Sequence, residues 1–94
     1  MTLNFDFQIK NLKGEPFDGD VNNASNILSN FLAVTNKGNS MKLWDWAQKI
    51  YKKEELNLDK TDLEVLQALV ENTENLPVIT KAQILEVIKK EIHK

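Results

Sequence analysis

The chain has no cysteine, no arginine and only three glycines among its 94 residues. Without cysteine there can be no disulfide bond, thiol catalysis or cysteine-based zinc site, and the composition fits a reducing cytoplasm. Arginine is the usual bidentate reader of phosphate, carboxylate and guanine, so its absence, with a net charge of −2, disfavours a dedicated nucleic-acid binder. The few scattered glycines exclude a glycine-rich phosphate loop.

Long apolar runs are also missing, since none approaches the roughly 18 residues of a membrane span. The first residues lack the basic and apolar segments of a secretory signal, so we expect a cytoplasmic protein that does not bind membranes. Hydrophobic residues make up 41% and charged residues 28% of the chain, values near globular averages. A chain this short supports one core, so residues 1–94 are predicted to form a single domain.

The N-terminal segment has the pattern of a β-hairpin. Apolar and polar residues alternate over residues 3–10, which is the period of a half-buried strand. A turn follows in which Gly14 can adopt a positive φ, and residues 15–17 can return as a short edge strand. Residues 1–18 are therefore predicted to form a hairpin, and the alternation near residues 56–58 is compatible with a short third strand.

Four later stretches repeat apolar residues with the period of an amphipathic helix. They cover residues 23–36, 40–53, 60–73 and 78–92. Asn39 or Ser40 can cap the second helix, and Asp59 can cap the third. The predicted fold class is α+β, mainly α, with the N-terminal hairpin packed on about four helices.

Several segments together resemble a type of small uncharacterised protein found in phage and prophage genomes. They are Phe5-Asp6-Phe7 to Gly14-Glu15-Pro16, Leu43-Trp44-Asp45-Trp46-Ala47, Leu56-Asn57-Leu58-Asp59 with Asp62, and Lys81-Ala82-Gln83-Ile84-Leu85-Glu86-Val87-Ile88. These segments cover most of the chain, but none is a functional signature. The resemblance implies a phage-encoded accessory protein that acts on a host or virion protein in the host cytoplasm, and it transfers no catalytic residue.

Motifs that carry chemistry are scarce. Residues 18–22 place oxygen atoms at alternating positions, as a calcium loop does, but the glycine and glutamate that such a loop requires are replaced by Asn23 and Ser29. A turn followed by a helix cap explains the same residues. His93 is the only imidazole and lies in a terminal turn, so neither a catalytic triad nor a zinc site can be built around it. We therefore expect no enzyme activity, no cofactor and no metal.

The most informative feature is a stretch without charge, residues 21–36. It gives the first predicted helix a face of small hydrogen-bonding side chains, which lose little on desolvation and are typical of interface cores. Trp44 and Trp46 flank the apolar face of the second helix, and we expect most of their area in the core with one indole edge accessible. The predicted partner-binding residues are Ser25, Asn26, Ser29, Asn30, Ala33, Trp44 and Trp46. Coverage of this face by the hairpin or the fourth helix is the alternative.

The leading hypothesis is a non-enzymatic protein–protein interaction module whose partner is another protein. A homo-oligomeric structural or assembly protein that uses the same surface is the first alternative. The less favoured alternative is nucleic-acid binding through Lys42, Lys49 and Lys53, which lie within about 40° of one another on the second predicted helix. The neighbouring aromatic side chains point away from these lysines, which weakens that alternative.

Overall fold

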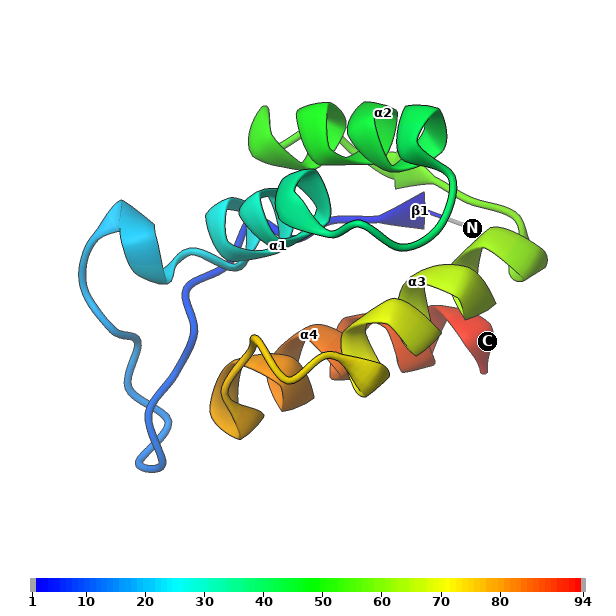
Figure 1. Cartoon of the computed structure of the whole chain (residues 1–94). Coiled ribbons are helices and arrows are strands. Elements are labelled where there is room, and N and C mark those ends of the chain that lie inside the picture. Colours follow the sequence, from blue (N-terminus) through cyan, green and yellow to red (C-terminus); the bar gives the residue numbers. More distant parts are fainter. Residues whose placement is uncertain (1, 94) are drawn as a thin grey trace.

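The computed structural model describes residues 2–93 and consists mainly of helices (Figure 1). The helices are α1 (Ala24–Val34), α2 (Ser40–Tyr51), α3 (Lys60–Asn72) and α4 (Val78–Ile92), with a short 3-10 helix η1 (Asp20–Asn22) before α1. Two short strands, β1 (Thr2–Leu3) and β2 (Leu56–Asn57), complete the fold. The prediction of an α+β, mainly α fold is confirmed in this coarse form. Met1 and Lys94, the ends of the predicted range, lie outside the described residues.

Three of the helices begin at a side-chain cap. The Asn23 side chain accepts a hydrogen bond from the backbone of α1, and Asn39 and Asp59 do the same for α2 and α3. Such a bond satisfies an amide that has no partner within the helix. Of the two candidates for the second cap, Asn39 is the one observed. Each helix begins within one residue and ends within two residues of its predicted range.

The sheet differs from the predicted hairpin. Its two strands are antiparallel and pair Thr2 with Asn57 and Leu3 with Leu56, so the N-terminal strand takes its partner from the segment near 56–58. Within residues 2–18, the two expected arms meet at a single bridge between Lys10 and Pro16. No regular third strand is present in the described part of the chain. Two local features prevent a regular hairpin. The backbone amide of Phe7 donates to the Phe5 carbonyl in a tight turn, and Pro16 has no N–H to donate to the opposite arm.

The helices form two pairs with the N-terminal segment between them. Helix α1 packs against α2 and α3 packs against α4, while β1 contacts α4 and β2 contacts α2. Figure 1 shows β1 lying between the two pairs. Apolar residues at alternate positions of this segment enter the core, as the pattern predicted. Leu3, Phe5 and Ile9 are all buried. The N-terminal segment therefore contributes apolar side chains to the core.

Candidate functional site

The polar side of α1 divides into a buried half and an exposed half. Ser25 is only 1% exposed and Ser29 is also buried, whereas Asn30 and Ala33 are exposed. Asn26 is half-buried. A partner could therefore reach Asn30 and Ala33 directly, whereas Ser25 is closed to it.

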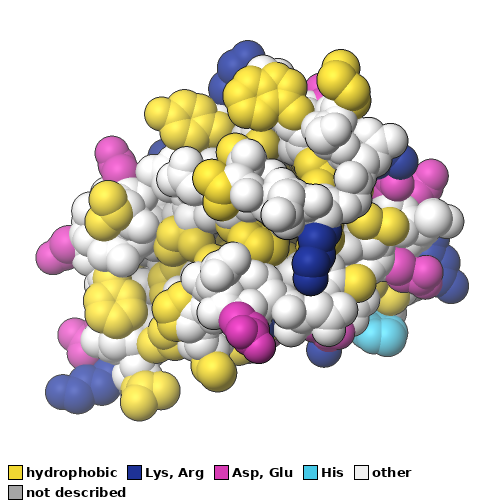
Figure 2. All heavy atoms as spheres, in the orientation of Figure 1, with side chains coloured by type: hydrophobic (Ala, Val, Ile, Leu, Met, Phe, Trp, Pro, Cys, Tyr) yellow, Lys and Arg dark blue, Asp and Glu magenta, His cyan; other side chains and the backbone are white. Residues whose placement is uncertain are grey.

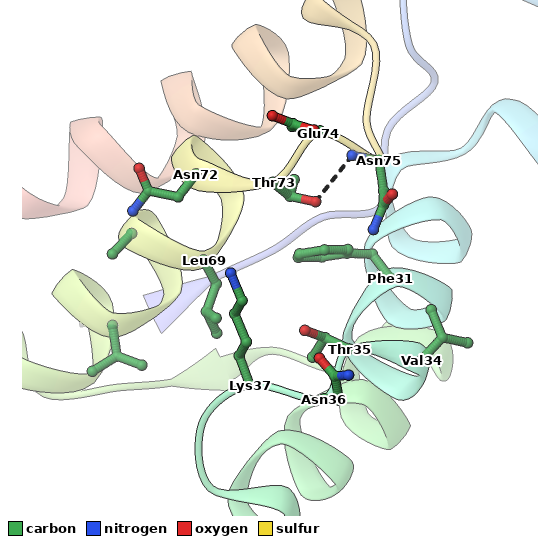
Figure 3. A pocket seen from close by; sticks show the side chains of 12 residues that line it. Phe31, Val34, Thr35, Asn36, Lys37, Leu69, Asn72, Thr73, Glu74 and Asn75 are labelled. Carbon is green, nitrogen blue, oxygen red and sulfur yellow. Dashed lines mark hydrogen bonds between the residues drawn. The ribbon is translucent and has the colours of Figure 1, made fainter.

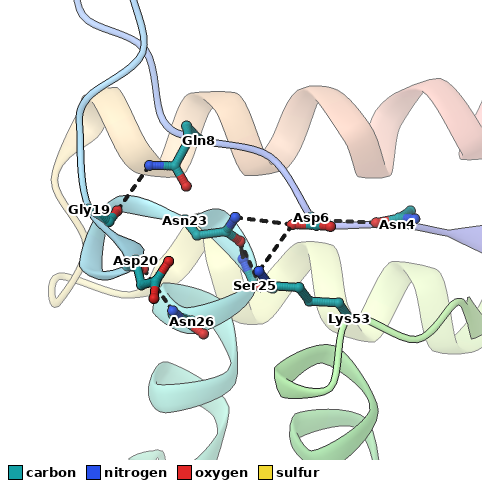
Figure 4. A network of polar contacts seen from close by, with 9 residues as sticks. All are labelled: Asn4, Asp6, Gln8, Gly19, Asp20, Asn23, Ser25, Asn26 and Lys53. Carbon is teal, nitrogen blue, oxygen red and sulfur yellow. Dashed lines mark hydrogen bonds and ion pairs between the residues drawn. The ribbon is translucent and has the colours of Figure 1, made fainter.

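A network of polar contacts accounts for the buried half (Figure 4). The Asn23 Oδ1 atom accepts hydrogen bonds from the Ser25 amide at 3.0 Å and from the Ser25 hydroxyl at 2.6 Å. The side-chain amide of Asn23 donates a hydrogen bond to the Asp6 carboxylate at 3.1 Å. The Lys53 ammonium lies 3.5 Å from the same carboxylate. These contacts tie the N-terminal segment to the start of α1 and the end of α2. The buried Ser25 hydroxyl is thus paired within the domain.

The neighbouring side chains are also used within the fold. The side-chain amide of Asn26 donates a hydrogen bond to the backbone carbonyl of Asp20 at 2.7 Å. The Ser29 hydroxyl donates one to the backbone carbonyl of Asn26 at 3.2 Å. Asp20 belongs to η1, so Asn26 fastens this short helix to α1. Part of the charge-free stretch is therefore engaged in hydrogen bonds within the domain.

The two tryptophans of α2 have different surroundings. Trp46 is only 4% exposed and belongs to the core, whereas Trp44 is 54% exposed. Residues two positions apart on a helix point in directions about 200° apart, so one can face the core while the other faces away from it. Tyr51, which is 62% exposed, joins Trp44 on the accessible side of α2. Of the two predicted tryptophans, only Trp44 is available to a partner.

A hollow of about 260 Å³ lies between α1 and α2. It is lined by Ser29, Asn30, Ala33, Trp44, Ala47, Gln48, Tyr51 and Lys52. Lys52 is the charged residue among these, and no carboxylate is present in this described lining. Figure 2 shows hydrophobic side chains, aromatic rings among them, standing over α2, with charged side chains mostly towards the margins of this face. The hollow is therefore uncharged apart from Lys52 in its lining.

The structure brings together four of the seven predicted residues in this hollow: Ser29, Asn30, Ala33 and Trp44. Ser25, Asn26 and Trp46 are not part of its lining. Gln48 and Tyr51 were missed by the sequence reasoning. They follow Trp44 at positions i+4 and i+7, which share one face of a helix, so a search for a second stripe on α2 would have found them.

The three lysines of the nucleic-acid alternative each have an acidic partner. The ammonium groups of Lys42, Lys49 and Lys53 lie 2.9, 3.1 and 3.5 Å from the carboxylates of Asp62, Asp45 and Asp6, respectively. The hydrogen bond to Asp62, and next its charge, raise the pKa of the Lys42 ammonium. A carboxylate beside each lysine reduces the attraction of this stripe for phosphate.

Within residues 2–93, no group of three histidine, cysteine or acidic side chains is placed to hold a metal ion. No helix in that range is both long enough and apolar enough to cross a membrane. Comparison with known proteins found no matching family model, no similar curated protein and no similar solved structure.

Proposed function

We propose that this chain is a non-enzymatic protein–protein interaction module that binds a segment of another protein in the hollow between α1 and α2. One observation carries the proposal: the exposed aromatic side chains of Trp44 and Tyr51 stand beside the uncharged, exposed end of α1 around a shared hollow. Tryptophan and tyrosine are enriched among residues that dominate binding energy, because each combines a large apolar area with a polar tip.

The lining of the hollow indicates the chemistry of the partner. Asn30, Ala33 and Gln48 carry no charge, so covering them costs less desolvation than covering lysine or glutamate would. A volume of about 260 Å³ suits one large apolar or aromatic side chain. Lys52 in the lining favours a carboxylate next to that side chain, since opposite charges across an interface set its register. The proposed partner segment therefore carries an apolar anchor beside an acidic residue.

The resemblance to phage and prophage proteins supplies the setting of the proposal. In that setting the chain is a phage-encoded accessory protein in the host cytoplasm, and the partner is a host or virion protein. The uncharged, exposed end of α1 supports binding to a protein surface, because interface cores are depleted in charge.

The test is a selection from a displayed library of random peptides, with a matched pair of variants. Ala33 and Ala82 are both exposed alanines on helices, but only Ala33 lines the hollow. We expect selected peptides to share an apolar residue next to an acidic one. They should bind Ala33→Glu at least about tenfold more weakly than Ala82→Glu, because the new carboxylate at position 33 enters the hollow and repels the acidic residue of the peptide. Equal binding to both variants, or peptides with no common pattern, would contradict the proposed surface.

A further inference from the structure

The residues of α2 that line the hollow between α1 and α2 form one continuous face of the helix. They recur at positions i, i+3, i+4, i+7 and i+8, and they are Trp44, Ala47, Gln48, Tyr51 and Lys52. At about 1.5 Å per residue, this face runs for about 12 Å along α2. Met41 is 79% exposed and precedes Trp44 by three residues, so it continues the same face for about 4.5 Å beyond the hollow. The accessible face of α2 is therefore about three turns long.

The backbone amides around this hollow already have partners. The lining residues belong to α1 and α2, and Lys52, the C-cap residue of α2, donates its amide to the Gln48 carbonyl. No amide of this described lining is thus left for an extended partner chain, which carries a donor and an acceptor at each residue. Side chains such as the amides of Asn30 and Gln48 can serve only a few of these groups, and each buried group left unpaired costs about 1–3 kcal/mol. A helical partner segment pairs its own backbone and avoids this cost.

The spacing of the side chains also favours a helix. Along α2, the side chains of the accessible face recur at intervals of about 4.5–6 Å, and the ridges of a second helix recur at the same intervals, so they fit between them. Side chains on one face of a strand recur at about 6.6–6.8 Å and lose this register within two turns of α2. Ala33 and Ala47 contribute small side chains from the two helices, while Trp44 and Tyr51 are exposed beside them. A helix can therefore approach closely between the aromatic rings and α1.

A second hollow, of about 720 Å³, lies between the ends of α1 and α3 and differs in character (Figure 3). Its lining includes residues of the segments that follow the two helices, among them Lys37 and Glu74. In Figure 3, Lys37 reaches from the segment after α1 towards Leu69, so a charged side chain of the chain itself extends into this hollow. The hollow between α1 and α2 has no comparable side chain in its described lining, and it is the better seat for the apolar face of a helix.

We infer that the partner segment is an amphipathic helix of about three turns that lies along α2, with an apolar residue in the hollow and an acidic residue beside Lys52. The inference rests on the proposed function, because it specifies the partner of the same hollow. The charges agree with it. The ion pairs within residues 2–93 include Lys49 and Lys53 but not Lys52, so the Lys52 ammonium is available to a carboxylate of the partner. Because Lys52 ends the accessible face of α2, that carboxylate belongs at one end of the partner helix.

The first test asks whether the partner extends along α2 beyond the hollow. Met41→Asp and Val78→Asp are a matched pair, because each places an aspartate at an exposed apolar position in the first turn of a helix, where an acid favours folding. Neither residue belongs to the described lining of the hollow. Peptides selected from the displayed library should bind Met41→Asp at least about tenfold more weakly than Val78→Asp, because a helix along α2 covers Met41.

The second test asks whether the bound peptide is helical. Mixing should increase the helical circular dichroism above the sum of the separate spectra. Proline in the middle of the peptide, outside its apolar and acidic positions, should weaken binding at least about tenfold, whereas alanine at the same position should not, because proline breaks a helix.

The two tests separate this inference from the proposed function. Peptides that bind Ala33→Glu more weakly than Ala82→Glu, yet tolerate the proline and bind Met41→Asp and Val78→Asp equally, would overturn the helical partner and leave the proposed function in place. If no peptide distinguishes Ala33→Glu from Ala82→Glu, the proposed function fails and the inference fails with it.

Discussion

Replacement of Asn23 by alanine tests the polar network at the start of α1. The Asn23 side chain caps α1 through the Ser25 amide, accepts the Ser25 hydroxyl hydrogen bond and donates to Asp6. Alanine keeps the helix sequence otherwise intact and removes all three interactions. The variant should therefore fold to the same structure with lower stability.

The size of the effect follows from the contacts. Loss of an asparagine cap costs about 0.5–2 kcal/mol. The Ser25 hydroxyl is buried, and leaving it without an acceptor costs about 1–3 kcal/mol more. Because the Asp6 carboxylate is largely exposed, the loss of its bond to Asn23 adds little. We expect Asn23→Ala to lower the free energy of unfolding by about 1.5–5 kcal/mol, a large part of the roughly 5–15 kcal/mol typical of a domain.

The assay is urea unfolding followed by circular dichroism, with the slope against denaturant checked to be unchanged. The informative control is the double variant Asn23→Ala/Ser25→Ala. Removal of the orphaned hydroxyl should recover about 1 kcal/mol relative to Asn23→Ala alone, because no buried donor is then left unsatisfied. A cost below about 0.5 kcal/mol for Asn23→Ala, or a double variant less stable than the single one, would refute this account of the network.

Two further predictions concern the tryptophans and an exposed acid. Trp46 is only 4% exposed, so Trp46→Ala should lower the free energy of unfolding by about 3–5 kcal/mol in urea unfolding. Trp44 is 54% exposed, so Trp44→Ala should lower it by about 1 kcal/mol or less. Equal losses would contradict the assignment of Trp46 to the core. The hydrogen bond from Gln67, and next that from Lys89, lower the pKa of Glu71 in the folded chain. A lowered folded pKa stabilises the fold above the ordinary carboxyl pKa of about 4.3, and this contribution is lost as the pH falls through the folded value. The urea midpoint should thus fall further from about pH 6 to about pH 3 in the natural chain than in Glu71→Gln, and parallel profiles would show that the two hydrogen bonds do not favour the charged form.

The helices could be predicted closely from the sequence because their signals are local. Apolar residues recur every three or four positions, and the caps Asn39 and Asp59 stand directly before the helices that they begin. The alternation of residues 3–10 also identified correctly that Leu3, Phe5 and Ile9 enter the core.

The strand partner could not be predicted with the same ease, because it depends on contacts between distant residues. Leu3 pairs with Leu56, and nothing in the N-terminal segment distinguishes that partner from the nearer residues 15–17. The alternation near residues 56–58 suggested a third strand, yet this segment supplies the second strand of the observed sheet.

A helical wheel also could not distinguish the exposed from the buried parts of the candidate site. A wheel places Ser25 on the polar side of α1, and only the folded chain brings Asn23 and the N-terminal segment over it. On α2, the apolar arc predicted from the sequence is wider than the buried one, so Trp44 and Tyr51 at one margin remain accessible. The residues at that margin are the ones on which the proposed function depends.

The most direct test of the proposed function is site-specific photo-crosslinking in the cells that encode the chain. A photoreactive amino acid is placed at Ala33, in the hollow between α1 and α2, or at Ala82, an exposed position of α4 outside it. We predict a cross-linked product with a different protein from position 33 that is absent from position 82 and is lost when Trp44→Ala is added. The same products from both positions, or none from position 33, would contradict the claim that this hollow binds another protein.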